Sequence, residues 1–463
     1  MDLQSDRLFP LDSRQRSIAR GIYDEVRDLP IISPHGHVDP NLLLANEQLP
    51  EPAQLLIYPD HYVTRLLHTL GVDMAEVSAG ADPRASWRLL AKKWRFLRGT
   101  AVHYWLTVQL REIFGIDLEL GPQTADAIYD QIQAQLQRPE YAPRALFERF
   151  RISVLATTDD PVDELSAHAE LANCDDLTGT VIPTFRPDVY LEPGAKAWAS
   201  HVSELGRAAD LDCDTYANWV TAMEARREYF RARGAKSTDH SHLSADCAPI
   251  ATADAKRIYR AALAGEATAA EVAALRGHMV FEMARMSADD GLTMTLHPGV
   301  ARAHHGPTLE RFGPDTGHDI PVQLELTRAL QPVLNSFGTA EKFKLVVFTI
   351  DETVYSRELA PLAGFYPSVY IGAPWWFLDA PDAILRWRSA ITETAGFYKT
   401  SGFIDDTRAF ISIPVRHDMA RRIDANFLSR LVCEHRITEE EAHEIARDLV
   451  VEVPQTVFNL NSV

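Results

Sequence analysis

The sequence predicts an α/β protein built as a (β/α)8 barrel of the TIM type, with a large helical insertion after the first strand. Eight short segments read as strands, and most are continuously apolar, which is typical of strands buried on both faces of a parallel sheet. Helical patterns separate these segments, and one separation is much longer than the others. A doubly wound parallel sheet is the alternative architecture for the same pattern.

The strand candidates follow one another at residues 29–33, 152–158, 180–185, 234–238, 292–297, 344–350, 368–373 and 402–405. The first two read LPIIS and ISVLATT, and the fourth, GAKST, is the weakest of the set. Counting this weak candidate brings the number of strands to the eight that a barrel of this type requires.

Helical periodicity accounts for much of the remaining chain. Residues 124–138 place Ile128, Ile132 and Leu136 on one face of an amphipathic helix, and residues 216–223 repeat the signal. Residues 41–150 read as mostly helical, so we expect residues 1–40 and 151–463 to form the barrel and 41–150 to cover its mouth. Residues 206–233 suggest a smaller helical excursion.

Composition narrows the function classes. The chain has 463 residues and a formal net charge of −19, which argues against nucleic acid and anionic membranes as partners. This net charge is compatible with an acidic small substrate, because a binding site can be locally cationic. There is no signal-peptide pattern and no apolar run of membrane-spanning length. The four cysteines lack CxxC spacing, so we expect a reducing, cytoplasmic setting.

In barrel enzymes the carboxyl ends of the strands build the active site. Polar or aromatic residues follow most of the predicted strands. They are His35, His37, Arg186, Asp239, His240, His242, His297, Asp351, Trp375, Trp376, Asp405, Asp406 and Arg408.

His35 and His37 suggest a metal site. On an extended backbone, residues i and i+2 point to the same side, and Gly36 allows a close approach. Two imidazoles with a carboxylate from Asp405 or Asp406 would make a mixed nitrogen and oxygen site for a divalent ion. Ordinary hydrogen-bonded histidines are the alternative. The metal is favoured because an aspartate ends the last predicted strand and His297 ends the fifth.

Arg186 and Arg408 suggest a carboxylate-bearing substrate, because a guanidinium fork binds a carboxylate in bidentate fashion. For each arginine alone, a structural salt bridge is an equally good interpretation. Trp375 is a candidate wall of a sugar-sized pocket, with core packing as the alternative.

Several stretches together resemble the uronate (glucuronate) isomerase family of the amidohydrolase superfamily. In family order they are SPHGHVDP, DHYVTRLL at 60–67, PTFRPD at 183–188, the His-Pro-Gly run at 297–299, FGPDTGHD at 312–319, GAPWWFLD at 372–379 and DDTR at 405–408. After His297 the chain reads GVARAHHGP, where the family pattern is rich in asparagine.

The resemblance implies a (β/α)8 barrel that interconverts D-glucuronate with D-fructuronate and D-galacturonate with D-tagaturonate. It implies one divalent metal ion, zinc or else manganese, held by His35, His37 and Asp406. Tyr62 and Asp406 would be catalytic. The substrate would contact Arg186, Arg408, Trp375 and His297, the last at a position where the superfamily often has another metal ligand. A homo-oligomer is compatible with the sequence.

Aldose–ketose isomerisation moves a hydrogen from C2 to C1, so it needs a base and stabilisation of the developing oxyanion. Asp406, Tyr62 or a water held by the metal could handle the protons. We favour proton transfer through an enediol(ate) over a metal-assisted hydride shift. A metal-dependent hydrolase with the same HxH and Asp framework is the alternative function, and a non-catalytic sugar-acid binding protein is a third.

Overall fold

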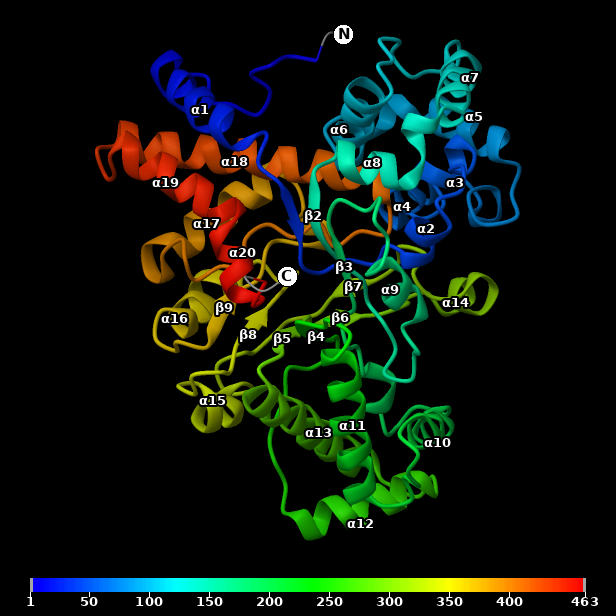
Figure 1. Ribbon diagram of the computed structural model, residues 1–463, viewed down its shortest axis with the longest axis vertical. Helices are drawn as coiled ribbons and strands as arrows, with labels where there is room; N and C mark the ends of the chain where they lie inside the picture. The colour runs from blue at the N-terminus through cyan, green and yellow to red at the C-terminus, as the bar shows by residue number, and fades with distance from the viewer. Residues whose placement is uncertain (1–2, 461–463) are drawn as a thin grey trace.

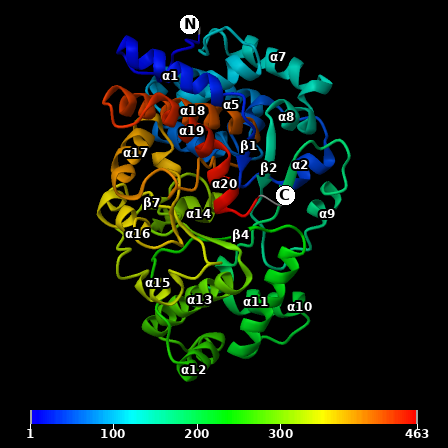
Figure 2. The same ribbon diagram turned by 60° about the vertical axis from the view of Figure 1, so that its left-hand side comes forward.

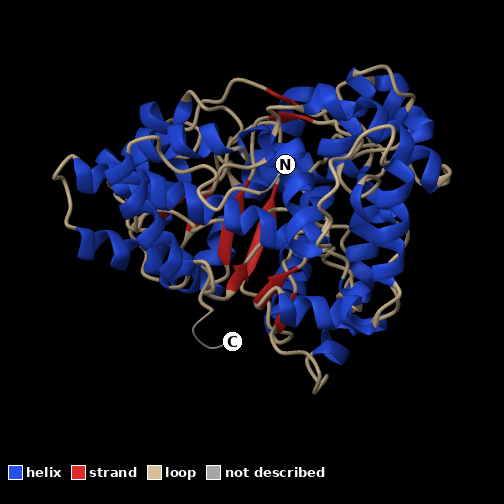
Figure 3. Cartoon of the chain, turned by 90° about the horizontal axis from the view of Figure 1, so that it is seen from above, coloured by secondary structure: helices blue, strands red, loops and turns tan. Residues whose placement is uncertain are grey.

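The computed structural model describes residues 3–460 and has an α/β architecture, with parallel strands at the centre and helices around them (Figure 1, Figure 3). Its parallel strands are β1 (Ile31–Ser33), β2 (Ile152–Ala156), β3 (Thr180–Ile182), β4 (Ser237–His240), β5 (Thr293–Leu296), β8 (Leu345–Val347) and β9 (Val369–Ile371). Within the described residues, β1-β2-β3 form one sheet and β4-β5-β8-β9 form another. The predicted α/β class with parallel sheets is confirmed.

Backbone pairing links the two sheets. Phe185, just beyond β3, pairs in parallel with Thr238 of β4. At the opposite edge, Ile371 of β9 pairs in parallel with Thr400. Farther along, the carbonyl of Thr407 accepts a hydrogen bond of 3.1 Å from the backbone N–H of His37, beyond β1. Strands that are neighbours in space are therefore also neighbours in chain order.

Three details differ from the predicted strands. The segment 402–405 is not a strand, because Gly402 has φ +74° and interrupts the extended backbone after the single bridge at Thr400. The weak candidate 234–238 begins too early, since Gly234 has φ +94° and β4 starts only at Ser237. A short antiparallel ribbon, β6 (Val300–Ala301) with β7 (Ile320–Pro321), was not predicted.

The α-helices occupy most of the chain between the strands. They are α1 (Ser13–Val26), α2 (Pro40–Ala45), α3 (Pro52–Leu56), α4 (His61–Thr69), α5 (Pro83–Lys93), α6 (Ala101–Val108), α7 (Ala125–Leu136), α8 (Pro143–Arg149), α9 (Ser166–Leu171), α10 (Trp198–Ala208), α11 (Tyr216–Arg231), α12 (Thr252–Leu263), α13 (Ala269–Asp290), α14 (Gly306–Phe312), α15 (Gln331–Phe337), α16 (Ala360–Ala363), α17 (Pro381–Ala395), α18 (Ile413–Cys433), α19 (Glu439–Val450) and α20 (Glu452–Val457).

Residues 41–150 fold as helices and turns between β1 and β2, and most of these helices gather at one end of the molecule (Figure 1, Figure 2). The helix predicted at 124–138 is confirmed as α7, whose predicted apolar face, Ile128, Ile132 and Leu136, is buried. Helices α10 to α13 lie at the opposite end in both views, and α11 confirms the helical signal at 216–223.

Local sequence signals explain where the long helices start and stop. Helix α13 is capped at its start by Thr268, which forms a reciprocal capping box with Glu271. It is capped at its end by Gly291, whose φ of +79° suits a residue without Cβ. Helix α18 packs against α1, α17 and α19. Within residues 3–460, each helix is too short or too polar to cross a membrane.

Candidate active site

A cavity of about 310 Å³ opens beside the carboxyl ends of the strands. It collects residues from segments that are far apart in the sequence. Its lining includes His37, His61, Tyr62, Arg186, Arg302, Trp375, Trp376, Asp406 and Arg408. Of the site residues that the family resemblance implies, all except the buried pair His35 and His297 line this one cavity. They are His37, Tyr62, Arg186, Trp375, Asp406 and Arg408.

The histidines predicted as metal ligands surround one carboxylate. Asp406 Oδ1 lies 2.9 Å from His37 Nε2 and 3.4 Å from His35 Nε2. Ligand atoms of His35, His297 and Asp406 also lie within 4.8 Å of one another. The structure thus brings His297 into the same cluster as His35 and Asp406.

The chemistry of these donors fits a divalent cation. His297 Nδ1 lies 2.8 Å from Asp239 Oδ1, so the ring N–H at Nδ1 can donate to Asp239 while Nε2 keeps its lone pair. Among the residues that the structure describes, this buried Nε2 has no hydrogen-bond partner. Imidazole nitrogen and carboxylate oxygen are ligands that zinc and manganese both accept.

The pKa shifts of His37, His297 and Asp406 favour metal binding, which requires neutral imidazoles and an ionised carboxylate. Burial lowers the pKa of His37 to about 4 and also lowers the pKa of His297. Burial alone would raise the pKa of Asp406, but hydrogen bonds from His35 and His37 hold it well below its usual range. For His35, burial opposes the Asp239 and Asp406 carboxylates, and its pKa is raised.

The structure distinguishes the two neighbouring aspartates. The Asp405 carboxylate accepts a hydrogen bond from Ser33 Oγ at 2.7 Å and lies 3.0 Å from His417 Nε2, so these two residues are its partners. Asp406 has φ +42°, a left-handed conformation that L-residues rarely adopt. This turn, and not the alternation of a strand, directs Asp406 toward His35 and His37.

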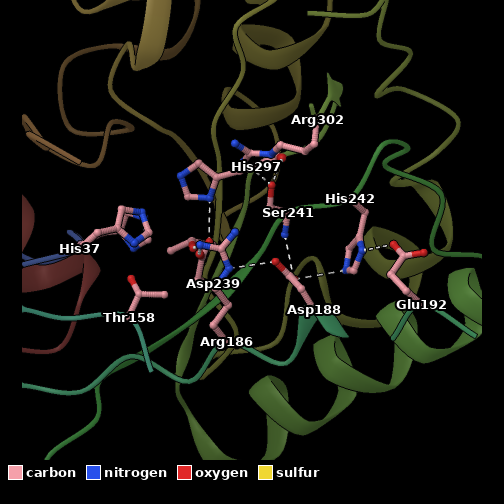
Figure 4. A network of polar contacts seen from close by, with 12 residues as sticks. His37, Thr158, Arg186, Asp188, Glu192, Asp239, Ser241, His242, His297 and Arg302 are labelled. Atoms are coloured by element: carbon pink, nitrogen blue, oxygen red, sulfur yellow. Dashed lines mark hydrogen bonds and ion pairs between the residues drawn. The ribbon is translucent and has the colours of Figure 1, made fainter. Parts of the chain in front are cut away.

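Arg186 lies between two carboxylates (Figure 4). Its Nε donates to Asp188 Oδ2 at 2.9 Å, and its Nη1 lies 3.4 Å from Asp239 Oδ2. Arg408 donates from Nη2 to Asp315 Oδ2 at 3.0 Å. Their side chains are 28% and 35% exposed, so both guanidinium groups remain accessible from the cavity despite these partners.

Tyr62 reaches the cavity because Asp60 caps helix α4 and accepts a hydrogen bond of 2.9 Å from the backbone N–H of Tyr62. Its ring packs edge-on against Trp376 with centroids 4.5 Å apart. Burial raises the pKa of the Tyr62 phenol, so the hydroxyl is neutral and can donate a proton or hydrogen bond. Trp376 itself has φ +56°.

Trp375 contacts His297 edge-to-face with ring centroids 5.0 Å apart, and it lines the cavity.

Sequence reasoning missed several lining residues. Arg302 donates to Asp319 Oδ2 at 2.7 Å and to Ser241 Oγ at 2.8 Å from a loop that has no periodic signal. His61 lies within the DHYVTRLL motif, and no role at the site was predicted for it. Burial lowers its pKa to about 3, so its imidazole is neutral. For His61, its position beside Tyr62 on the first turn of a helix was the available signal.

A second cavity of about 570 Å³ borders the first and shares His37, Arg186 and Arg408 with it. Asp159 lines this second cavity and is buried, accepting hydrogen bonds from Thr157 Oγ1 at 2.6 Å and Thr184 N at 3.1 Å. Burial raises the pKa of Asp159 to about 7.

Comparison with known proteins gives a consistent result. The family model for glucuronate isomerase matches residues 7–458. The uronate isomerase of Cutibacterium acnes is 49% identical over 99% of both chains, and that of Corynebacterium efficiens is 48% identical over 98% of both. The crystal structure of glucuronate isomerase from Caulobacter crescentus superimposes with a TM-score of 0.97 at 40% identity, covering 100% of this chain and 98% of that one.

The uronate isomerase structure from Thermotoga maritima gives a TM-score of 0.94 at 27% identity, covering 99% of this chain and 100% of the other. These matches span almost the whole chain and include the segments that line the cavity. The chain therefore belongs to the uronate (glucuronate) isomerase family and is an enzyme with uronate isomerase activity.

Proposed function

We propose that the 310 Å³ cavity converts D-glucuronate to D-fructuronate and D-galacturonate to D-tagaturonate by proton transfer through an enediol(ate). The observation that supports this most strongly is the convergence of Tyr62, Asp406, Arg186 and Arg408 on one small, partly enclosed space. These groups supply a proton donor, a carboxylate base and two anion-binding cations.

We propose that the parallel strands close into a (β/α)8 barrel formed by residues 1–40 and 151–463, with residues 41–150 as an inserted helical unit over its mouth. The chain-ordered parallel pairing and the hydrogen bond from His37 N to Thr407 O support closure. The cavity then lies at the carboxyl end of the barrel, where enzymes of this fold place their active sites.

We propose that His35, His37 and Asp406 hold one divalent ion, with zinc preferred and manganese as the alternative. Such an ion polarises a carbonyl oxygen and stabilises the negative charge that develops on it. We assign the unpartnered Nε2 of His297 to a hydroxyl of the substrate, since Asp239 already orients this ring.

The proton inventory of the reaction balances without an external reductant. Asp406, held ionised, takes the proton from C2, while the neutral phenol of Tyr62 donates to the carbonyl oxygen on C1. The proton held by Asp406 then returns to C1 as the hydroxyl at C2 becomes the new carbonyl and reprotonates Tyr62. One carbon–hydrogen bond breaks, one forms, and the carbonyl moves from C1 to C2.

Arg186 and Arg408 bind the C6 carboxylate of the substrate, and Trp375 forms an apolar wall. A charge-assisted contact contributes on the order of 1.5–3 kcal/mol, or roughly ten- to a hundredfold in binding. The enzyme should therefore prefer hexuronates over the corresponding neutral aldoses by at least this factor.

The test compares turnover of glucuronate, galacturonate, glucose and galactose, with and without a chelator. We expect turnover of the uronates, loss of activity after metal removal, and recovery when zinc or manganese is restored. Arg186→Met should lose most of the preference for uronates while keeping its metal. Equal turnover of neutral aldoses by the wild-type enzyme would refute the carboxylate clamp.

A further inference from the structure

A chain of polar side chains extends from Arg186 on the side away from His37 (Figure 4). Asp188 Oδ2 accepts from Arg186 Nε at 2.9 Å, and Asp188 Oδ1 accepts from the backbone N–H of Ser241 at 3.0 Å. His242 Nε2 lies 3.6 Å from the same Oδ1, and His242 Nδ1 lies 2.8 Å from Glu192 Oε1. The chain is therefore continuous from the cavity wall to a residue of the outer loop.

This chain of contacts is mostly buried at Asp188, which contacts Arg186, and at His242. The His242 side chain is 1% exposed and that of Asp188 is 17% exposed, whereas Glu192 is half-buried. Arg276 of helix α13 donates to Glu192 Oε2 at 3.3 Å and anchors the far end. Buried polar groups hold a defined geometry because breaking their hydrogen bonds leaves them without partners.

A metal ion is the other occupant that this cluster could attract, since ligand atoms of Asp188, His240 and His242 lie within 4.8 Å of one another. Both Asp188 oxygens, however, already accept hydrogen bonds, one from the backbone and one from a guanidinium. A second cation beside Arg186 would be repelled by it. Arg186 is thus the cation that neutralises Asp188.

We propose that Asp188, supported by Ser241 N, His242 and Glu192, is the positioning residue that orients the Arg186 guanidinium toward the substrate carboxylate. This inference rests on the proposed role of Arg186 in binding uronates. Within the described part of the chain, the side-chain contacts of Arg186 use Nε for Asp188 and Nη1 for Asp239. Holding these two nitrogens fixes the plane of the fork and leaves Nη2 to meet the ligand.

The test is a double-mutant cycle of Asp188→Asn and Arg186→Met, with kcat, KM and metal content measured for each protein. Asp188→Asn should raise KM for glucuronate on the order of tenfold, the equivalent of one charge-assisted contact, with a smaller change in kcat. In the Arg186→Met background, the same substitution should change KM by less than about twofold, because the group it positions is gone. His242→Gln should show a weaker version of this pattern.

Asp424→Asn is the matched control. Asp424 pairs with Arg388 at 2.7 Å, and its side chain is 14% exposed, but it lies on helix α18 and does not line the cavity. This variant should lower thermal stability and leave KM unchanged. If Asp188→Asn behaves like this control, Asp188 has only a structural role and the inference fails.

The remaining outcomes separate the two proposals. If Arg186→Met raises KM but Asp188→Asn does not, the positioning role is wrong and the role of Arg186 stands. If Arg186→Met leaves KM unchanged, both are wrong. Equal effects of Asp188→Asn in the two backgrounds, or loss of a second equivalent of metal in that variant, would overturn the inference.

Discussion

The burial of Asp159 predicts how strongly the free energy of unfolding depends on pH. Its carboxylate is buried beside the second cavity, and burial raises its pKa from 3.8 to about 7. Asp159→Asn keeps the shape and removes the ionisation. The amide oxygen can still accept from Thr184 N, the bond that measures 3.1 Å in the native protein.

The direction in which the stability changes with pH follows from how tightly the folded and unfolded states bind the Asp159 proton. The folded protein holds the Asp159 proton more tightly than the unfolded chain, so the native state loses stability as the pH rises from about 4 to about 7. A gap of about three pKa units corresponds to about 4 kcal/mol at 1.36 kcal/mol per unit. Below pH 4 both states are protonated and this cost disappears.

Urea unfolding of wild type and Asp159→Asn at pH 5 and pH 8 measures this difference. Because the carboxyl of the unfolded chain is already mostly ionised at pH 5, about two of the three pKa units remain between pH 5 and pH 8. The variant should therefore gain about 2.5 kcal/mol relative to wild type between the two pH values. Subtracting the wild-type curve removes the contributions of all other titrating groups. A stability difference that is the same at both pH values would refute the assigned cause.

Three further changes test the site and the fold. His37→Ala should lower metal content at least tenfold by elemental analysis, whereas the exposed His305→Ala should keep it; equal retention would remove His37 from the ligand set. Tyr62→Phe should lower kcat by about 10²–10⁴ in steady-state assays without metal loss, and unchanged kcat would exclude it as the acid. Gly372→Ala should destabilise the protein by about 1–3 kcal/mol in thermal unfolding, because its Cβ would overlap the Phe348 ring; an unchanged melting temperature would contradict this packing.

The strands were predictable where burial dominates local preference. β5 and β8 are buried along their full length. β8 reads LVV within the apolar run at 344–350, and β5 reads TMTL, which alternates threonine with apolar residues. β4 reads STDH and has no apolar residue, so its own sequence does not predict a strand, and the predicted segment 234–238 overlaps only its first two residues. The segment after β9 looked extended, but Gly402 adopts a left-handed conformation that its apolar neighbours do not reveal.

The site was predictable to the extent that its residues stand next to strands or in family motifs. Asp406 Oδ1 lies within 3.4 Å of Nε2 of both His35 and His37, although the turn at Asp406 has no counterpart in the sequence pattern. Arg302 enters from a loop after β6, and its role depends on long-range partners such as Asp319. Spacing along the chain carries no information about such contacts.

Two non-glycine residues at the cavity, Asp406 and Trp376, have backbone conformations with positive φ, which glycine adopts most readily. Each conformation costs about 1–2 kcal/mol for an L-residue, so the cavity contains unfavourable energy that packing elsewhere must offset. This arrangement is a trade-off between stability and preorganisation. Glycine at either position would relax the backbone but would remove a side chain that lines the cavity. Efforts to make this enzyme more heat-resistant should therefore leave these two turns alone and seek their gains in the outer helices.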